Sequence, residues 1–179
     1  MKNGDIVINR NNTNANRTYH NIVAGFHGVG KSTAASMYPY RFIDMESSYY
    51  HWTFDENGNK KCHPYWPKNY VDSIVELANN TFNGICGVNV IGISTHKEVL
   101  DELASRGIAF DAVCPISKEI YIKRCIDRGN NEAFVEPLQD KFESFVQDIK
   151  DSNAGTIYFT DGYFADLFYD GSGNNSDVK

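Results

Sequence analysis

The sequence predicts an α/β protein built on a parallel β-sheet with helices on both faces. Short apolar runs alternate with segments of helical periodicity along most of the chain, which is the pattern of repeated strand–helix–strand units. Residues 88–94 read as one apolar run, as expected of a strand that helices cover on both faces. A chain of 179 residues is most simply one domain, and it is long enough to bury a substantial core.

Five strands and five helices are expected. The strands cover residues 19–25, 41–44, 88–94, 110–114 and 156–160, and the helices cover residues 31–38, 70–79, 97–106, 118–128 and 132–150. Pro39 ends the first helix, because its ring cannot continue the hydrogen-bond ladder. Residues 5–10 are expected to be a short extended piece before an asparagine-rich loop. Residues 51–69 are expected to be irregular around the turn signal Glu56-Asn57-Gly58-Asn59.

Two helices carry apolar stripes that predict buried faces. The stripe of the second helix consists of Val71, Ile74, Val75 and Ala78, and that of the last helix consists of Phe134, Leu138, Phe142, Phe145 and Ile149. Residues 1–170 are expected to form the single domain, followed by a flexible tail of residues 171–179.

Composition excludes several functional classes. No apolar run approaches the ~20 residues that span a bilayer, and the N-terminus has no apolar segment of a secretory signal. The four cysteines are scattered without metal-ligand spacing and are expected to be reduced thiols of a cytoplasmic protein. A net charge of −6 argues against a surface for duplex DNA, although a few local cations suffice for a small anionic substrate.

A glycine-rich motif follows the first confident strand. Residues 25–32 read Gly-Phe-His-Gly-Val-Gly-Lys-Ser and match G-x-x-x-x-G-K-[ST] in full, between a predicted strand and a predicted helix. Glycines let backbone N–H groups turn around phosphates, and the helix directs its positive end at them. We expect Lys31 to reach the β- and γ-phosphates of ATP and the Ser32 hydroxyl to ligate Mg²⁺. The expected ATP-binding residues are Phe26, His27, Gly28, Val29, Gly30, Lys31, Ser32 and Thr33.

Other motifs decide between classes of phosphate-loop protein. A GTPase needs a base-reading N-K-x-D motif, which the chain lacks. A motor or transporter ATPase usually ends a later apolar strand in Asp-Glu, whereas the run 88–94 is followed by Thr95 and His96. The class that remains is a kinase of nucleotides or of other small molecules.

Four further stretches carry a family resemblance: FIDMESSYY, WPKNYVDSI, ISTHKEVLDEL and KEIYIKRCIDRG. Together with the glycine-rich motif, they are similar to small phage-type P-loop kinases of the nucleotide kinase superfamily, described as deoxynucleoside monophosphate kinases. The resemblance implies a three-layer P-loop kinase fold with a five-stranded parallel sheet in the order 2-3-1-4-5. It implies an acceptor segment at about residues 47–70 and a lid at about residues 124–135. It also implies ATP and Mg²⁺ as cofactors, a role in nucleotide metabolism and, for a phage protein, the host cytoplasm.

Asp44 and Glu46 follow the second strand, at the carboxyl edge of the sheet where ligands of α/β proteins bind. In similar kinases of the shikimate type, a carboxylate pair at this place holds Mg²⁺ or its water and contacts the acceptor hydroxyl. By this resemblance, Asp44 orients the metal or acts as a base, and Glu46 assists. The alternative is a solvated helix cap beside Ser47 and Ser48.

Arg124 and Arg128 lie four residues apart, on one face of the predicted helix 118–128. Similar kinases use such a pair in the mobile lid that closes over the triphosphate, where a guanidinium donates two hydrogen bonds at once. The resemblance therefore makes both arginines catalytic, with a hinge at residues 129–131. The alternative is an ordinary solvated helix face.

An aromatic segment follows the second strand. Tyr50 and Trp52 are candidates to stack on or cover an acceptor ring, and the alternative is a small core beneath a long loop. His96 follows the third strand and is a candidate acceptor contact. A capping box formed by Thr95 and Glu98 is expected beside it.

We expect the acceptor to be a (deoxy)nucleoside monophosphate. Similar kinases generally grip that monophosphate with an arginine, and this chain has none between Phe42 and Ser105. A hydroxyl on a small molecule or a modified nucleobase therefore stays open as acceptor, as does a non-catalytic nucleotide-binding module. No membrane and no duplex DNA are expected as partners, and a homodimer stays open. The expected catalytic residues are Lys31, Asp44, Arg124 and Arg128, the metal ligands Ser32 and Asp44, and the substrate contacts Asp44, Glu46, Tyr50, Trp52 and His96.

Overall fold

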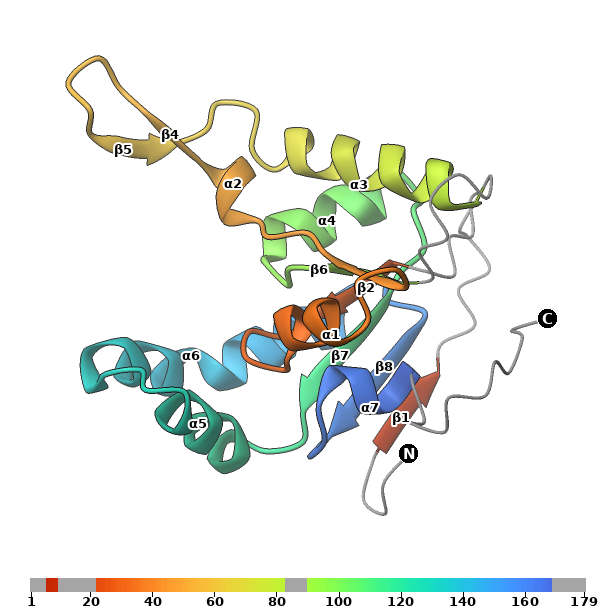
Figure 1. Ribbon diagram of the computed structural model, residues 1–179, viewed down its shortest axis with the longest axis vertical. Coiled ribbons are helices and arrows are strands. Elements are labelled where there is room, and N and C mark those ends of the chain that lie inside the picture. Colours follow the sequence, from red (N-terminus) through yellow and green to blue (C-terminus); the bar gives the residue numbers. More distant parts are fainter. Residues whose placement is uncertain (1–5, 10–21, 83–89, 169–179) are drawn as a thin grey trace.

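The computed structural model describes residues 6–9, 22–82 and 90–168, and it contains a six-stranded sheet (Figure 1). The five parallel strands are β2 (Ile22–Gly25), β3 (Phe42–Asp44), β6 (Val90–Ile93), β7 (Asp111–Pro115) and β8 (Thr156–Thr160). Their spatial order, β3-β6-β2-β7-β8, confirms the predicted order and the central place of β2. An antiparallel edge strand, β1 (Ile6–Asn9), pairs with β8 as a sixth strand. The asparagine-rich loop and the C-terminal tail lie outside the described residues.

Helices cover both faces of the parallel sheet. On one face, α1 (Lys31–Met37) contacts α7 (Phe164–Phe168), in front of the sheet in Figure 1. On the other face, α4 (Lys97–Ser105) contacts both α3 (Lys68–Phe82) and α6 (Glu132–Asp151), and α6 contacts α5 (Lys118–Asp127). A single-turn α2 (Ser48–His51) follows β3. The sequence did not predict α2 or α7, because one turn of helix is too short to show a periodicity.

The core lies between the central strands and these helices. β2 and β6 are buried along their whole length, which explains why their sequences are apolar rather than alternating. The predicted face of α3 is confirmed: Val71, Ile74 and Ala78 are fully buried, and Val75 packs against them. The predicted core position of Phe134 is wrong. Its side chain is 43% exposed, whereas its neighbour Val135 in the same turn of α6 is buried.

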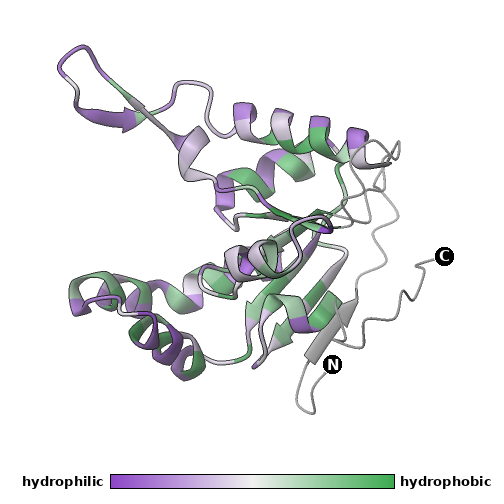
Figure 2. Ribbon diagram, in the orientation of Figure 1, coloured by the Kyte–Doolittle hydropathy of each residue, from purple (hydrophilic) through white to green (hydrophobic). Residues whose placement is uncertain are grey.

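A β-hairpin replaces the predicted irregular stretch. β4 (Trp52–Phe54) pairs with β5 (Lys60–Cys62), and the pair projects from the body of the protein at the upper left of Figure 1. The turn closes on Asp55, whose Oδ1 accepts hydrogen bonds from the N–H groups of Asn57 and Asn59, while Gly58 supplies a φ of 78°. Figure 2 shows β5 and the turn as hydrophilic. Two strands of three residues gave no recognisable period in the sequence.

The N-terminal caps of the helices differ from the one cap that the sequence predicted. The capping box expected at Thr95 and Glu98 is wrong: α4 begins after His96, and no side-chain hydrogen bond caps it in the described part of the chain. By contrast, Ser117 caps α5 and Asn131 caps α6, each accepting an N–H from the third residue onward. Among the described residues, no helix has the length and apolar character that crossing a membrane requires.

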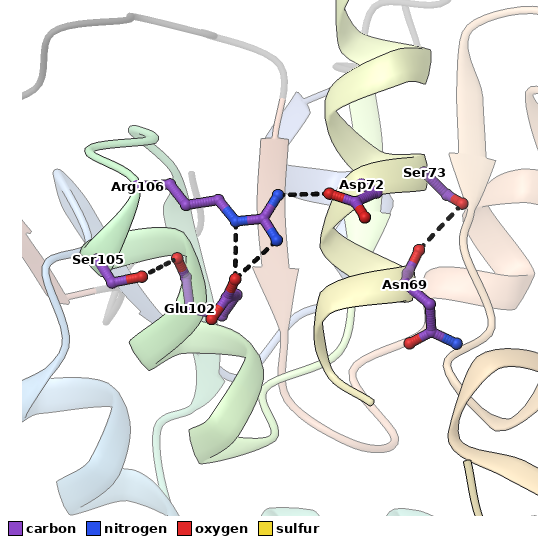
Figure 3. Close-up of polar contacts among 6 residues, drawn as sticks. All are labelled: Asn69, Asp72, Ser73, Glu102, Ser105 and Arg106. Carbon is purple, nitrogen blue, oxygen red and sulfur yellow. Dashed lines mark hydrogen bonds and ion pairs between the residues drawn. The ribbon is translucent and has the colours of Figure 1, made fainter. Parts of the chain in front are cut away.

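Arg106 joins α3 to α4 just beyond the end of α4 (Figure 3). Its Nη1 lies 2.5 Å from Asp72 Oδ1 on α3, and its Nη2 lies 2.7 Å from Glu102 Oε1 one turn back on α4. A planar guanidinium can hold both carboxylates at once, whereas an ammonium cannot match this fork. Arg106 therefore fixes α3, which follows the hairpin, against α4.

We expect Arg106→Lys to lower the free energy of unfolding by about 0.5–1 kcal/mol, because the pair is partly exposed and only one carboxylate keeps its partner. The loss should shrink in 1 M salt, where exposed ion pairs are screened. Urea denaturation at low and high salt measures both effects. Lys97→Ala, which removes an exposed pair with Asp101 inside α4, serves as the control and should cost less.

Candidate functional site

The glycine-rich loop lies where β2 ends and α1 begins. Gly28 and Gly30 adopt φ angles of 79° and 98°, which residues with a Cβ rarely adopt. A Cβ at Gly30 would also lie 3.2 Å from Cδ1 of Tyr163. Phe26 and Val29 are fully buried, so their side chains anchor the loop in the core. The glycines permit the turn, and the apolar residues fix it to the sheet.

Two backbone hydrogen bonds hold this loop to neighbouring elements. The N–H of Phe26 donates to the carbonyl of Val113 on β7 at 2.8 Å, and the carbonyl of Val29 accepts from the N–H of Phe164 on α7 at 2.8 Å. The amide and the side chain of Phe26 are therefore both engaged within the fold. Of the residues predicted to bind ATP, Phe26 and Val29 serve the shape of the loop, whereas Ser32 and Thr33 are exposed at the start of α1.

Lys31 turns back from α1 over the end of the sheet. Its Nζ donates a hydrogen bond to the carbonyl of Gly25 at 2.7 Å. Burial lowers the pKa of this amine, and the nearby carboxylates of Asp44 and Glu46 act in the opposite direction. A partly desolvated ammonium gains more from an anionic partner than one in water does.

Ser32 and Asp44 meet at the carboxyl edge of the sheet. The Ser32 hydroxyl donates to Asp44 Oδ2 at 2.7 Å, and Asp44 Oδ1 is buried without a hydrogen-bond partner among the described residues. A buried carboxylate oxygen without a partner is costly unless a cation or a donor completes it. Mg²⁺ takes one or two protein oxygens together with phosphates and waters, so this hydroxyl–carboxylate pair fits it. The structure thus brings together the two residues predicted to hold the metal.

Glu46 lies two residues after Asp44 but in a different environment. Its carboxylate is exposed, and Oε1 accepts the N–H of Ser48 at 3.1 Å. This contact is the helix-cap role that the sequence left as the alternative. The Glu46 charge still acts on Lys31, so Glu46 remains at the rim of the site.

His27 belongs to the glycine-rich loop, and Arg128 lies beside this loop at the end of α5. His27 Nδ1 lies 3.3 Å from the Tyr121 hydroxyl, and its ring lies 5.6 Å from that of Phe134. Nη1 of Arg128 lies near the loop, 3.9 Å from where a Cβ at Gly28 would be. Burial lowers the pKa of His27, and the positive charges of Lys31 and Arg128 lower it further. Lys31 and Arg128 therefore bring positive charge to the loop, and His27 stays neutral there.

Arg124 lies apart from this group. Its Nη2 donates to the carbonyls of Asp161 and Gly162, and its guanidinium lies 4.8 Å from the centre of the Tyr163 ring. Nη1 is buried without a partner among the described residues. The predicted lid pair is thus divided in this structure: Arg128 faces the glycine-rich loop, whereas Arg124 ties α5 to the turn between β8 and α7.

A column of stacked rings connects the hairpin to the core, and we call it the aromatic column. Its members are Trp52, His51, Trp66 and Tyr70, in that order. His51 lies between the two indoles, 4.2 Å from the Trp52 ring and 4.3 Å from the Trp66 ring, and nearly parallel to both. Lys60 Nζ lies 4.4 Å from the centre of the Trp52 ring. The column attaches the hairpin to α3, where Tyr70 is fully buried.

His96 lies against the side of the aromatic column. Its ring meets those of His51 and Trp66 edge-on, with 5.6 Å between the ring centres in both cases, and its Nδ1 lies 2.9 Å from Ser94 Oγ. Tyr50 packs its ring against Tyr70 at 5.1 Å, so it belongs to the packing around α3. The charges of Lys31 and Glu46 both act on His96, which is one of the predicted acceptor contacts.

The sequence did not single out several residues of this region. Tyr121 and Tyr163, which contact the glycine-rich loop or its arginine neighbour, had no predicted role. Trp66 belongs to the predicted aromatic segment, but its stacking on His51 in the middle of the aromatic column was not predicted. A signal existed for His51, which sits among aromatic residues next to the predicted acceptor contacts. Tyr163 lies in the turn after the last strand, where the sequence shows no motif.

We expect the free energy of unfolding to fall as the pH drops through about 6.5, the ordinary pKa of histidine. Burial lowers the pKa of both His27 and His96 in the folded protein, so the unfolded chain takes up protons first. Stability is therefore lost toward acid pH. Urea denaturation at pH 7.5 and 5.5 measures the loss, and the double variant His27→Gln/His96→Gln should show less of it. An equal loss in both proteins would contradict this explanation.

A scan against protein-family models finds no match to this chain, and a search of curated proteins finds no significant relative. The function proposed below therefore rests on the motif, the fold and the geometry of the site.

Proposed function

We propose that this protein is an ATP- and Mg²⁺-dependent phosphotransferase that moves the γ-phosphoryl group of ATP to a (deoxy)nucleoside monophosphate. The observation that carries the proposal is the meeting of Ser32 and Asp44, 2.7 Å apart, with Asp44 Oδ1 buried and unpartnered in the described part of the chain. Both residues lie beside a loop whose two glycines have positive φ angles. A hydroxyl and a carboxylate at the end of such a loop are the protein groups that a nucleotide–magnesium complex requires.

In the proposed nucleotide-binding site, each residue has one task. Backbone N–H groups of the glycine-rich loop other than those of Phe26 and Val29, which donate within the fold, would hold the phosphates together with the N-terminal end of α1. Lys31 would leave the carbonyl of Gly25 and donate to the β- and γ-phosphates. Ser32 and Asp44 would hold Mg²⁺, which neutralises charge on the phosphates when bound.

Cations around the loop favour transfer over simple binding. Phosphoryl transfer spreads charge over the transferred group, so that positive groups stabilise the transition state more than the ground state. Arg128 lies beside the loop together with Lys31. In this proposal, Arg128 stabilises the transferred group. Arg124 reaches the site only if the turn at Asp161–Gly162 releases it.

The acceptor would lie between Asp44 and His96, with the hairpin beside it. His96 keeps a neutral imidazole there, because burial lowers its pKa, and a neutral ring can donate or accept a hydrogen bond. The aromatic column gives this side of the site a stacked apolar wall that suits a nucleobase. The protein would act in the cytoplasm as an enzyme of nucleotide metabolism.

One observation favours a second acceptor, a hydroxyl group of a small molecule or of a modified nucleobase. The chain has no arginine between Phe42 and Ser105, and the carboxylates of Asp44 and Glu46 would repel an anionic monophosphate. The same carboxylates suit a hydroxyl, whose proton a base must accept. A monophosphate acceptor carries negative charge on the group that attacks the γ-phosphate, whereas a hydroxyl acceptor is neutral there.

An assay of ADP production distinguishes these proposals. The purified protein is incubated with ATP and Mg²⁺ and with nucleoside monophosphates or small alcohols, one at a time. ADP formation with a monophosphate supports the first acceptor, and formation with an alcohol supports the second. Tight ATP binding without ADP formation for any acceptor would leave a nucleotide-binding module. Absence of ATP binding, measured by calorimetry, would overturn the proposal as a whole.

A further inference from the structure

Gly92 interrupts a strand that otherwise consists of β-branched residues. β6 reads Val-Ile-Gly-Ile and is fully buried, and a glycine in such a strand weakens it. Glycine at a strand interior often marks a place where another group approaches the backbone closely. Gly92 lies beside Val23 on β2 and Asp44 on β3, and its carbonyl accepts the N–H of Met45 at 2.9 Å. Gly92 therefore lies in the sheet directly beside Asp44, the predicted metal ligand.

Two side chains approach Gly92, the ring of Phe42 and the stem of Lys31. A Cβ at Gly92 would lie 3.3 Å from Lys31 Cδ, and a Cβ at Gly25 on the neighbouring strand would lie 2.8 Å from both Cγ and Cδ. The stem of Lys31 thus crosses bare backbone on two adjacent strands. Phe42 lies beside Gly92 and Phe164 beside Gly25, and their rings lie 5.0 Å apart. We call this passage the lysine channel.

We propose that Gly92, which lies outside the glycine-rich motif, is a positioning residue that sets the path of Lys31 through the lysine channel. A methyl group on residue 92 would lie 3.3 Å from Lys31 Cδ and displace the stem, which already lies against the bare backbone of Gly25. The amine would then leave the carbonyl of Gly25. Gly92 itself would touch neither nucleotide nor acceptor. The effect on ATP binding rests on the function proposed above, whereas the effect on Lys31 does not.

A purely structural role for Gly92 makes a different prediction. The nearest atom to a Cβ at Gly92 is Phe42 Cζ at 2.5 Å, followed by Phe42 Cε1 at 3.1 Å. Gly92 would then serve only to admit the Phe42 ring. Leucine lacks both of these ring atoms, so in a Phe42→Leu background a methyl group at residue 92 meets mainly Lys31. The informative comparison is therefore Phe42→Leu against Phe42→Leu/Gly92→Ala.

The test follows the side chain of Lys31 by NMR in protein labelled with ¹³C-lysine, with the signals assigned by their loss in Lys31→Arg. In Phe42→Leu, we expect nuclear Overhauser contacts between the γ- and δ-protons of Lys31 and the α-protons of Gly25, because the stem crosses bare backbone there. In Phe42→Leu/Gly92→Ala, these contacts should weaken, and ATP affinity should fall about tenfold. Unchanged contacts and equal ATP affinity in the two variants would overturn the proposal.

Gly155→Ala is the matched control. A Cβ at Gly155 would find its nearest neighbour, Asp111 Oδ1, at 3.3 Å, which is the distance at which a Cβ at Gly92 meets Lys31 Cδ, and nothing of Lys31 is among its close contacts. The control should leave both the Lys31 contacts and ATP affinity unchanged. If the natural chain binds no ATP, the proposed function fails, but the contacts of Lys31 still decide the role of Gly92.

A second measurement applies if Phe42→Leu/Gly92→Ala proves too unstable for NMR. Gly92→Ala is combined with Lys31→Ala, and the unfolding free energies of the four proteins form a double-mutant cycle. Because the shortened residue 31 no longer enters the channel, Gly92→Ala should destabilise the Lys31→Ala protein less than the natural one. Equal destabilisation in both backgrounds would also overturn the proposal.

Discussion

Lys31→Met should abolish phosphoryl transfer and leave the fold intact. Methionine keeps an apolar stem in the lysine channel but carries no charge for the β- and γ-phosphates. Loss of one group that stabilises the transition state costs about 10²–10³-fold in turnover in other enzymes, and the lysine of a phosphate loop also holds the substrate. We therefore expect kcat/KM for ATP to fall by at least about 10³-fold, measured as ADP released with the identified acceptor.

The stability of the same variant provides an independent check. Burial lowers the pKa of Lys31, which means that the fold desolvates this ammonium at a cost. Replacing it with a neutral side chain of similar length should therefore leave the thermal midpoint unchanged or raise it. Lys141→Ala, at an exposed position of α6, should change neither activity nor stability. Full activity of Lys31→Met would contradict the proposed function.

Asp44→Asn should lower turnover by about 10²-fold or more and raise the Mg²⁺ concentration needed for half-maximal activity. The amide can still accept the Ser32 hydroxyl, so the local structure should survive. It lacks the negative charge that the unpartnered Oδ1 would offer to the metal in the described site. Titrations of activity with Mg²⁺ measure both effects.

The metal dependence separates the two roles open to Asp44. If Asp44 only holds the metal, saturating Mg²⁺ should restore part of kcat in Asp44→Asn. If Asp44 is the base for a hydroxyl acceptor, metal should not restore kcat. Ser32→Thr keeps the metal-binding hydroxyl and should stay active, whereas Ser32→Ala should share the raised Mg²⁺ requirement. Unchanged metal dependence in both Asp44→Asn and Ser32→Ala would refute the metal site.

The parallel sheet and the central place of β2 were predictable from strand–helix alternation, whereas the full strand order came from the family resemblance. The position of the site followed from the parallel direction of the strands, since the glycine-rich loop follows β2 and Asp44 ends β3, and the carboxyl ends of both strands lie at one edge with β6 between them. Predicting the contact between Ser32 and Asp44 therefore required only the motif and the topology. The hairpin was in principle visible as well, because Asp55 and Gly58 form a turn between two short extended stretches.

Other features had no signal in the sequence. Arg124 binds the backbone carbonyls of Asp161 and Gly162, and every residue of a chain carries such a carbonyl, so no side-chain pattern marks the partner. Helical spacing also could not show that Val135, and not Phe134, is the buried residue in the first turn of α6. Gly92 likewise becomes informative only when the path of Lys31 is known.

The aromatic column has an optical consequence. The chain contains two tryptophans, Trp52 and Trp66, and both stack on His51. The tryptophan fluorescence of this protein therefore originates at the hairpin and its attachment to α3. Emission at the red edge of the spectrum reports the environment of these two indoles alone. The protein thus carries its own spectroscopic probe on the side of the site opposite the glycine-rich loop, without any introduced label.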